Sequence, residues 1–202
     1  MFFDTPAFDL LLLKLINQQG HTWLLNDAMR LLSSRIALFA VLVPAVLLLV
    51  KRHGRKQLML FLLLLVSMGL TDMATSQVKD SIQRVRPLHS VAGTYYVDEG
   101  QWLRLPPDFV QTKTKGSSYP SGHAANIACL ATLCLLLWPK TRPWLAGLPL
   151  AVGYSRIYLG KHFPSDVLAG WLFGLTIAVL IWLVWKRWLE ALVFKPDAEK
   201  LL

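Results

Sequence analysis

Apolar residues in this chain are gathered into long runs, and short polar connectors separate the runs. The clearest of them are Ile36–Val50, Leu58–Leu70, Ala124–Trp138 and Val167–Trp185. Runs that approach about 20 apolar residues have the length of a helix that crosses a bilayer. The pattern predicts an all-α fold, a polytopic integral membrane helical bundle that forms a single domain over residues 1–202.

Five membrane spans are expected from these runs and their polar ends. We place them at about Ser34–Val50, Gln57–Lys79, Ser121–Trp138, Trp144–Leu159 and Ser165–Trp185. Pro44 lies inside the first span, where a proline typically kinks a helix. The N-terminal residues 1–32 are apolar but interrupted by polar residues, and Phe8, Leu11, Leu12, Leu15 and Ile16 recur at helical spacing. This segment is predicted to be an interfacial amphipathic helix, and the alternative, a true crossing, would give six spans.

Composition and charge narrow the class of protein further. Of the 202 residues, 54% are hydrophobic and 16% charged, which excludes a disordered chain and disfavours a water-soluble enzyme. The net charge of +9 suits an anionic membrane surface, a phosphate-bearing substrate or nucleic acid. No nucleic-acid partner is expected, because the basic residues are divided among short connectors.

The short connectors also predict how the chain is oriented. Three connectors on one face carry Lys51, Arg52, Arg55 and Lys56, then Lys140 and Arg142, then Lys186 and Arg187. The positive-inside rule makes that face cytoplasmic and places the chain in the cytoplasmic (inner) membrane. Cations also occur on the opposite face, where the polar stretch 88–119 is predicted to be an extracytoplasmic loop region that is functional or mobile.

Three polar clusters lie at span ends on this extracytoplasmic face. They are Lys79-x6-Arg86-Pro87, Pro120-Ser121-Gly122-His123, and Ser155-Arg156-x5-His162-x3-Asp166. Taken alone, Lys79 and Arg86 are more typical of snorkelling cations, Pro120–His123 of an ordinary turn and cap, and His162 of a polar loop. Arg156 is the exception, because a charge within a span usually faces a partner or a wet cavity, which favours a function. Because helix direction alternates, all three reach one membrane surface, so the sequence predicts that they share a pocket.

The residue types in these clusters suit chemistry on a phosphate. Lys79, Arg86 and Arg156 provide three cations for one anion, and arginine matches phosphate oxygens in a bidentate way. Ser121 is placed as an N-cap and Gly122 permits close backbone approach, so the start of a helix points at the phosphate. His162 and His123 are a candidate nucleophile and general acid, and Asp166 is placed to hold the His162 ring.

At these residues the sequence resembles the type 2 phosphatidic acid phosphatase superfamily, which also includes vanadium-dependent haloperoxidases. The resemblance covers about Leu58–Trp185, and all three motifs match. It implies that His162 forms a phosphohistidine, that Asp166 orients His162, and that His123 protonates the leaving oxygen and later activates water. It implies a phosphoryl pocket made by Lys79, Arg86, Arg156, Ser121 and the Gly122 amide, with no metal or cofactor.

The resemblance leads us to expect a membrane lipid phosphatase, with undecaprenyl diphosphate as the leading substrate. Phosphatidylglycerophosphate, phosphatidic acid and lipid A 1-phosphate are alternatives, and the loop 88–119 is expected to influence the choice. A lipid phosphotransferase would use the same site but pass the phosphoryl group to another lipid. A vanadate-dependent oxidase and a non-catalytic lipid-binding or transport protein are the remaining hypotheses.

Overall fold

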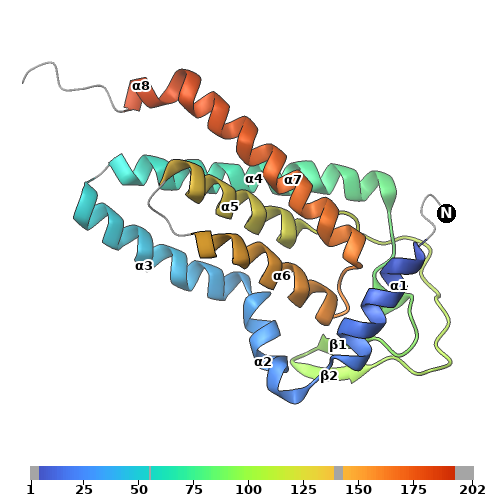
Figure 1. Cartoon of the computed structure of the whole chain (residues 1–202). Coiled ribbons are helices and arrows are strands. Elements are labelled where there is room, and N and C mark those ends of the chain that lie inside the picture. Colours follow the sequence, from blue (N-terminus) through green and yellow to red (C-terminus); the bar gives the residue numbers. More distant parts are fainter. Residues whose placement is uncertain (1–4, 55, 139–142, 194–202) are drawn as a thin grey trace, which may run out of the picture.

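The computed structural model describes residues 5–54, 56–138 and 143–193. Five helices form the body: α3 (Arg35–His53), α4 (Lys56–Ile82), α5 (Gly122–Leu137), α6 (Gly147–Tyr158) and α7 (Pro164–Val184). They lie side by side as a bundle, with α5 packed against α4, α6 and α7 (Figure 1). The predicted class, an all-α polytopic membrane bundle, is confirmed.

Three of the five predicted spans are long and apolar enough to cross a membrane as helices. They correspond to Ile36–His53, Gln57–His89 and Pro164–Val193, and α3 continues through Pro44. The predicted spans Ser121–Trp138 and Trp144–Leu159 form shorter helices, α5 with 16 residues and α6 with 12. At 1.5 Å per residue these are about 24 Å and 18 Å long, less than a hydrocarbon core of about 30 Å.

α6 is short because a different element occupies each of its ends. The 3-10 helix η3 (Pro143–Ala146) precedes it. After it, Gly160 adopts the left-handed conformation (φ +64°) and turns the chain out of the helix. A side chain at Gly160 would come within 2.6 Å of the Tyr95 carbonyl oxygen, so the turn fits only glycine.

The N-terminal segment, expected as one amphipathic helix, is divided by a turn. α1 (Ala7–Leu13) continues into the π-helical η1 (Lys14–Gln19), and α2 (Trp23–Leu32) follows. Asp9 and Asn17 are fully buried in the protein, whereas the leucines of α1 at positions 10, 11 and 12 are exposed. Two of the polar interruptions, Asp9 and Asn17, therefore face the bundle, and the interfacial location of this segment stays a prediction.

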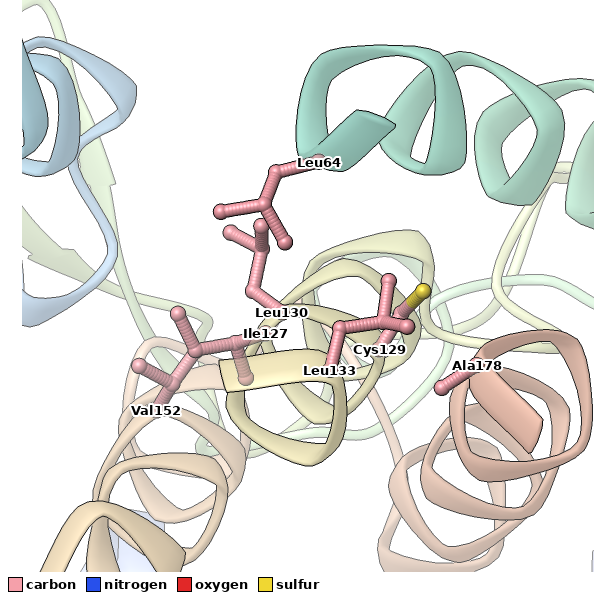
Figure 2. Packing of buried hydrophobic residues seen from close by; sticks show 7 residues of the cluster. All are labelled: Leu64, Ile127, Cys129, Leu130, Leu133, Val152 and Ala178. Atoms are coloured by element: carbon pink, nitrogen blue, oxygen red, sulfur yellow. The ribbon is translucent and has the colours of Figure 1, made fainter. Parts of the chain in front are cut away.

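The apolar core surrounds α5. Leu64 of α4, Val152 of α6 and Ala178 of α7 point toward α5 from three directions (Figure 2). Their partners on α5 are Ile127, Cys129, Leu130 and Leu133. The contact between α5 and α7 is close because α7 presents glycines there: a Cβ at Gly174 would lie 2.1 Å from the Ala125 carbonyl oxygen. Small residues permit such an approach between membrane helices.

The predicted loop region 88–119 contains structure that the apolar pattern did not indicate. After the 3-10 helix η2 (Pro87–His89), strands β1 (Tyr95–Asp98) and β2 (Gln101–Arg104) form an antiparallel hairpin. Its two-residue turn, Glu99–Gly100, has positive φ at both positions, as a type I′ turn requires. Tyr95 and Tyr96 followed by such a turn are a hairpin signal that the sequence contained.

One end of the bundle gathers the ends of α4 and α6, the starts of α5 and α7, α1 and the hairpin (Figure 1). Backbone hydrogen bonds connect these segments: the Ser121 amide donates to the Asp166 carbonyl (2.8 Å) and the Ser118 amide to the Arg84 carbonyl (2.9 Å). The π-helix η4 (Trp185–Leu189) and α8 (Glu190–Val193) lie at the opposite end. Of the residues used to predict orientation, Arg55, Lys140 and Arg142 lie outside the described residues.

Candidate active site

His162 lies in the turn between α6 and α7 and is 2% exposed. Its Nδ1 is 2.8 Å from the carbonyl oxygen of Ser118. A carbonyl oxygen only accepts, so Nδ1 must carry the proton and donate it there. In the neutral ring this leaves the lone pair on Nε2. The contact therefore fixes the tautomer that a nucleophilic imidazole requires.

Asp166 is the third residue of α7 and is fully buried. Its carboxylate accepts hydrogen bonds from Ser118 Oγ (2.5 Å), the Phe163 amide (2.8 Å) and Arg84 Nη1 (2.6 Å). Its Oδ2 lies 3.7 Å from His162 Nδ1, longer than the bond from His162 to Ser118. The sequence placed Asp166 directly on the ring, whereas the structure inserts Ser118 between them, with its hydroxyl on Asp166 and its carbonyl on His162.

Arg84 is a site residue that sequence reasoning missed. It is 5% exposed and lies over the Phe163 ring, 4.1 Å from its centroid. Besides Asp166, its guanidinium bonds Asp9 of α1 (Nη2 to Oδ2, 2.7 Å). Arg84 is one of the cations that the sequence places on the extracytoplasmic face, and Asp9 is one of the polar residues that interrupt the apolar segment 1–32. The one signal available was a carboxylate inside an apolar segment, which requires a partner when buried.

Arg86, Arg156 and Lys161 influence one another electrostatically, and the two arginines also act on the His162 ring. Arg156 of α6 is 4% exposed, and Arg86 is half-buried with Nη2 3.2 Å from Ser117 Oγ. Burial lowers the pKa of Lys161, and the charges of Arg156 and Arg86 lower that pKa further. Burial likewise lowers the pKa of His162 to about 4, with Arg156 and Arg86 adding to the effect and Asp166 opposing it. Cations that lower one another's pKa values repel each other, and an anion bound among them relieves that repulsion.

The start of α5 contributes the remaining phosphate-binding candidates. Ser121 occupies the N-cap position as expected, but its side chain makes no capping hydrogen bond. Its Oγ is buried and has no hydrogen-bond partner in the described part of the chain. A Cβ at Gly122 would lie 3.0 Å from Lys79 Nζ, so the ammonium group lies against the helix start. A helix N-terminus, a cation and an unused hydroxyl thus meet at one point, which suits a phosphate.

His123 is half-buried and lines a cavity of about 650 Å³ between α2, α3, α4, α5 and α6. Most of the lining is apolar, including Leu38, Met68 and Ile127. Near His123 the lining includes Asp72, whose carboxylate accepts a hydrogen bond from Asn126 (2.8 Å). The general-acid candidate therefore stands where an apolar cavity meets polar groups.

The structure thus brings a candidate nucleophile with a fixed tautomer, a group of cations and a helix start to one end of the bundle. In such a set, the cations and the helix start can bind a phosphoryl group, and the imidazole can attack its phosphorus. Among the described residues, no cluster of three or more His, Cys, Asp or Glu side chains is placed to hold a metal ion. The metal-independence expected from the sequence stays a prediction.

Comparison with known proteins places the same residues in a family context. The family model of the PAP2 superfamily matches residues 60–190. An undecaprenyl-diphosphatase of Sulfolobus acidocaldarius is 33% identical over 176 residues, which cover 86% of this chain and 77% of that protein. Phosphatidylglycerophosphatase B of Bacillus subtilis is 37% identical over 94 residues, covering 40% of this chain and 46% of that protein.

The fold is also similar to a solved structure. The crystal structure of Aquifex aeolicus LpxE superposes with a TM-score of 0.65 at 23% identity, covering 90% of this chain and 98% of that one. At this identity the likeness shows the fold alone. It extends well beyond the motifs, because it includes nearly the whole of both chains.

Proposed function

This chain belongs to the PAP2 superfamily and is a membrane lipid phosphatase of that family, and from this premise we propose that it hydrolyses undecaprenyl diphosphate through a phosphohistidine on His162. The observation that carries the proposal is the Nδ1 contact of His162 with the Ser118 carbonyl (2.8 Å), which leaves Nε2 as the nucleophilic nitrogen beside Arg86 and Arg156.

In the first step, His162 Nε2 attacks the terminal phosphorus and forms a P–N bond as the P–O bond to the leaving group breaks. His123 gives a proton to that leaving oxygen, and undecaprenyl phosphate departs. In the second step, His123 takes a proton from a water molecule, whose oxygen attacks phosphorus and breaks the P–N bond. Inorganic phosphate leaves and both histidines are restored.

The cations have a separate role in both steps. Lys79, Arg86 and Arg156 neutralise the equatorial phosphoryl oxygens, while the Gly122 amide and Ser121 Oγ donate hydrogen bonds to them. Asp166 and Ser118 stabilise the positive charge that His162 acquires during attack. These groups are in place before substrate binds, and preorganised donors of this kind usually make the largest contribution to rate.

The apolar cavity supports a lipid substrate. It reaches His123, so a lipid tail in the cavity would place its phosphate end beside the general acid. The Sulfolobus relative is named for undecaprenyl diphosphate, and the match to it is the longest of the relatives described above. The Bacillus relative, named for phosphatidylglycerophosphate, makes that lipid the second candidate.

The site is proposed to face the exterior of the cytoplasmic membrane. The last turn of α3, which contains Lys51 and Arg52, and η4, which contains Lys186 and Arg187, lie at the bundle end opposite to the motifs, as the positive-inside rule requires. The described part of the N-terminal segment, residues 5–32, then lies at the outer surface, beside the site, where its exposed leucines would contact lipid.

The test is a phosphate-release panel in detergent with undecaprenyl diphosphate, phosphatidylglycerophosphate, phosphatidic acid and lipid A 1-phosphate. We expect the highest kcat/KM for undecaprenyl diphosphate and none for His162→Gln, with Trp188→Phe, at the opposite end of the bundle, as a matched control. Retained turnover in His162→Gln would refute the nucleophile. Labelled phosphate on a second lipid, in place of free phosphate, would identify a phosphotransferase.

A further inference from the structure

The N-terminal helix contributes a charged residue to a buried network that ends at the site. Asp9 of α1 and Asp166 of α7 are both fully buried, and Arg84 lies between them. The contacts are Arg84 Nη2 to Asp9 Oδ2 (2.7 Å) and Arg84 Nη1 to Asp166 Oδ1 (2.6 Å). From Asp166 the network continues through Ser118 to His162. One chain of contacts thereby joins Asp9 to His162, which lies 153 positions later in the sequence.

Asp9 is itself held in place from the α7 side. Its Oδ1 accepts a hydrogen bond from the Ser165 amide (2.8 Å), and its Oδ2 accepts one from the Ser165 hydroxyl (2.5 Å). The Ser165 hydroxyl also lies 2.7 Å from Arg84 Nη1. Asp9 therefore fixes Arg84 relative to the first turn of α7, which is the turn that presents Asp166.

Fold stability alone does not account for this arrangement. Removing three charges from water is costly, and apolar groups of similar volume are often as stable or more so. The triad of Asp9, Arg84 and Asp166 has a net charge of −1 beside a ring that becomes positive during attack. Without Asp9, the Arg84 cation would cancel the charge of Asp166 as felt by His162. With Asp9 present, Arg84 orients Asp166 and the site keeps its negative charge.

We propose that Asp9 and Arg84 are positioning residues of the phosphatase site: Asp9 anchors and compensates Arg84, and Arg84 holds Asp166 in the orientation through which Ser118 fixes the His162 ring. α1 is then part of the catalytic machinery. The inference rests on the proposed chemistry at His162, and neither residue touches the substrate.

The experiment compares Asp9→Asn, Arg84→Gln and the double variant with wild type, using farnesyl diphosphate in detergent micelles as the probe. We expect Asp9→Asn to lower kcat by about tenfold to a hundredfold, the scale of a displaced catalytic group, with little change in KM. Arg84→Lys should recover part of the activity lost in Arg84→Gln, because an ammonium keeps the positive charge but cannot bond both carboxylates with the geometry of a guanidinium.

The pH profile separates positioning from mere packing. The charged groups that act directly on His162 are Arg86, Arg156 and Asp166, and they are the same in all variants, so any change comes from Arg84 and Asp9 behind Asp166. Loss of the Asp9 charge leaves the positive charge of Arg84 uncompensated. This charge lowers the pKa of His162, so the acid limb of kcat/KM should move to lower pH. Loss of the Arg84 charge should move it to higher pH, and the double variant should lie near wild type. If Arg84→Gln does not fold, the double variant, which buries one carboxylate fewer, still reports the lowered kcat.

The matched control is Asn17→Ala, which removes another buried polar contact of the N-terminal segment: Asn17 bonds the backbone of Tyr95 and Tyr158. It should lower thermal stability and leave kcat and the acid limb unchanged. The inference is overturned if Asp9→Asn behaves like Asn17→Ala. It is also overturned if Asp9→Asn and Arg84→Gln move the acid limb of kcat/KM in the same direction. His162→Gln is assayed alongside: if it retains turnover the proposed function fails, whereas an inactive His162→Gln with a wild-type-like Asp9→Asn refutes only the positioning roles.

Discussion

The site has two sides that differ in how completely their polar groups are bonded. On the bonded side (Ser118, His162, Asp166 and Arg84), the Asp166 carboxylate accepts three hydrogen bonds and the His162 ring has a fixed partner. On the open side (Lys79, Arg86, Ser121 and Gly122), Ser121 Oγ and Arg86 Nε are buried with no hydrogen-bond partner among the described residues.

Buried polar groups without partners are uncommon and costly in native proteins. At Ser121 and Arg86 they fit a proposed phosphate-binding side that ligand oxygens complete, whereas the contacts of Ser118 with His162 and Asp166 assemble the proposed nucleophile within the protein itself. Substitutions on the bonded side should therefore impair catalysis and stability together, and those on the open side should impair catalysis without a loss of stability.

The largest expected effect is that of Asp166→Asn on the bonded side. An amide keeps only one acceptor oxygen and presents a donor in place of the other, so the Arg84 contact on Oδ1 and the Ser118 and Phe163 contacts on Oδ2 cannot all survive. We expect kcat to fall by about a thousandfold or more, as when the orienting aspartate of a Ser-His-Asp triad is lost, with KM little changed. Steady-state phosphate release measures both, and a kcat within tenfold of wild type would contradict the orienting role.

On the open side, Arg86→Ala should lower kcat/KM by about a hundredfold, because a preorganised cation for the phosphoryl oxygens is lost. Arg86→Lys should recover part of this, since the charge is kept and the bidentate geometry is not. Arg104→Ala serves as the control: Arg104 is an exposed cation on the hairpin and should leave the rate unchanged. Equal losses in Arg86→Ala and Arg104→Ala would indicate a general field in place of a specific contact.

Two serine substitutions test the difference between the sides directly. Ser118→Ala removes the bond to Asp166 and should cost about 1 kcal/mol of unfolding free energy as well as lowering kcat. Ser121→Ala removes a hydroxyl that has no hydrogen-bond partner in the part of the chain that the structure describes, so thermal stability should be unchanged or higher, while kcat/KM falls by about tenfold. Thermal melts in detergent and phosphate release give both quantities, and a destabilised Ser121→Ala would remove the distinction.

The smallest effect concerns pH. Because the pKa of His162 is lowered from 6.5 to about 4, the ring stays neutral as pH falls through 6.5 and gains a proton only near pH 4. The His162 contribution to activity should thus be nearly constant from pH 8 to pH 5. Titration of 13C-labelled histidine by NMR, with His162→Gln to assign the signal, measures this, and a midpoint near 6.5 would show that the ring is solvated.

The degree to which each region could be predicted follows from the range of its interactions. The spans within α3, α4 and α7 were readable because a bilayer selects long apolar runs, which are local in sequence. The span from Trp144 to Leu159 was predicted correctly at its end, since α6 ends at Tyr158, but α6 begins only at Gly147 because residues 143–146 form the 3-10 helix η3, which local hydropathy does not distinguish from an α-helix. The hairpin was missed because its strands are short and lie in a polar segment.

For the site, the sequence by itself determined which residues gather at one end of the bundle, because helix direction and motif position at span ends are local properties of the chain. Tertiary structure alone decided how they are connected. Ser118 separates Asp166 from the His162 ring, and Arg84 joins Asp166 to Asp9. These partners lie 44 to 82 positions apart, so only the packing of α1, α5 and α7, which depends on glycines in α7 and the turn at Gly160, brings them within hydrogen-bond distance.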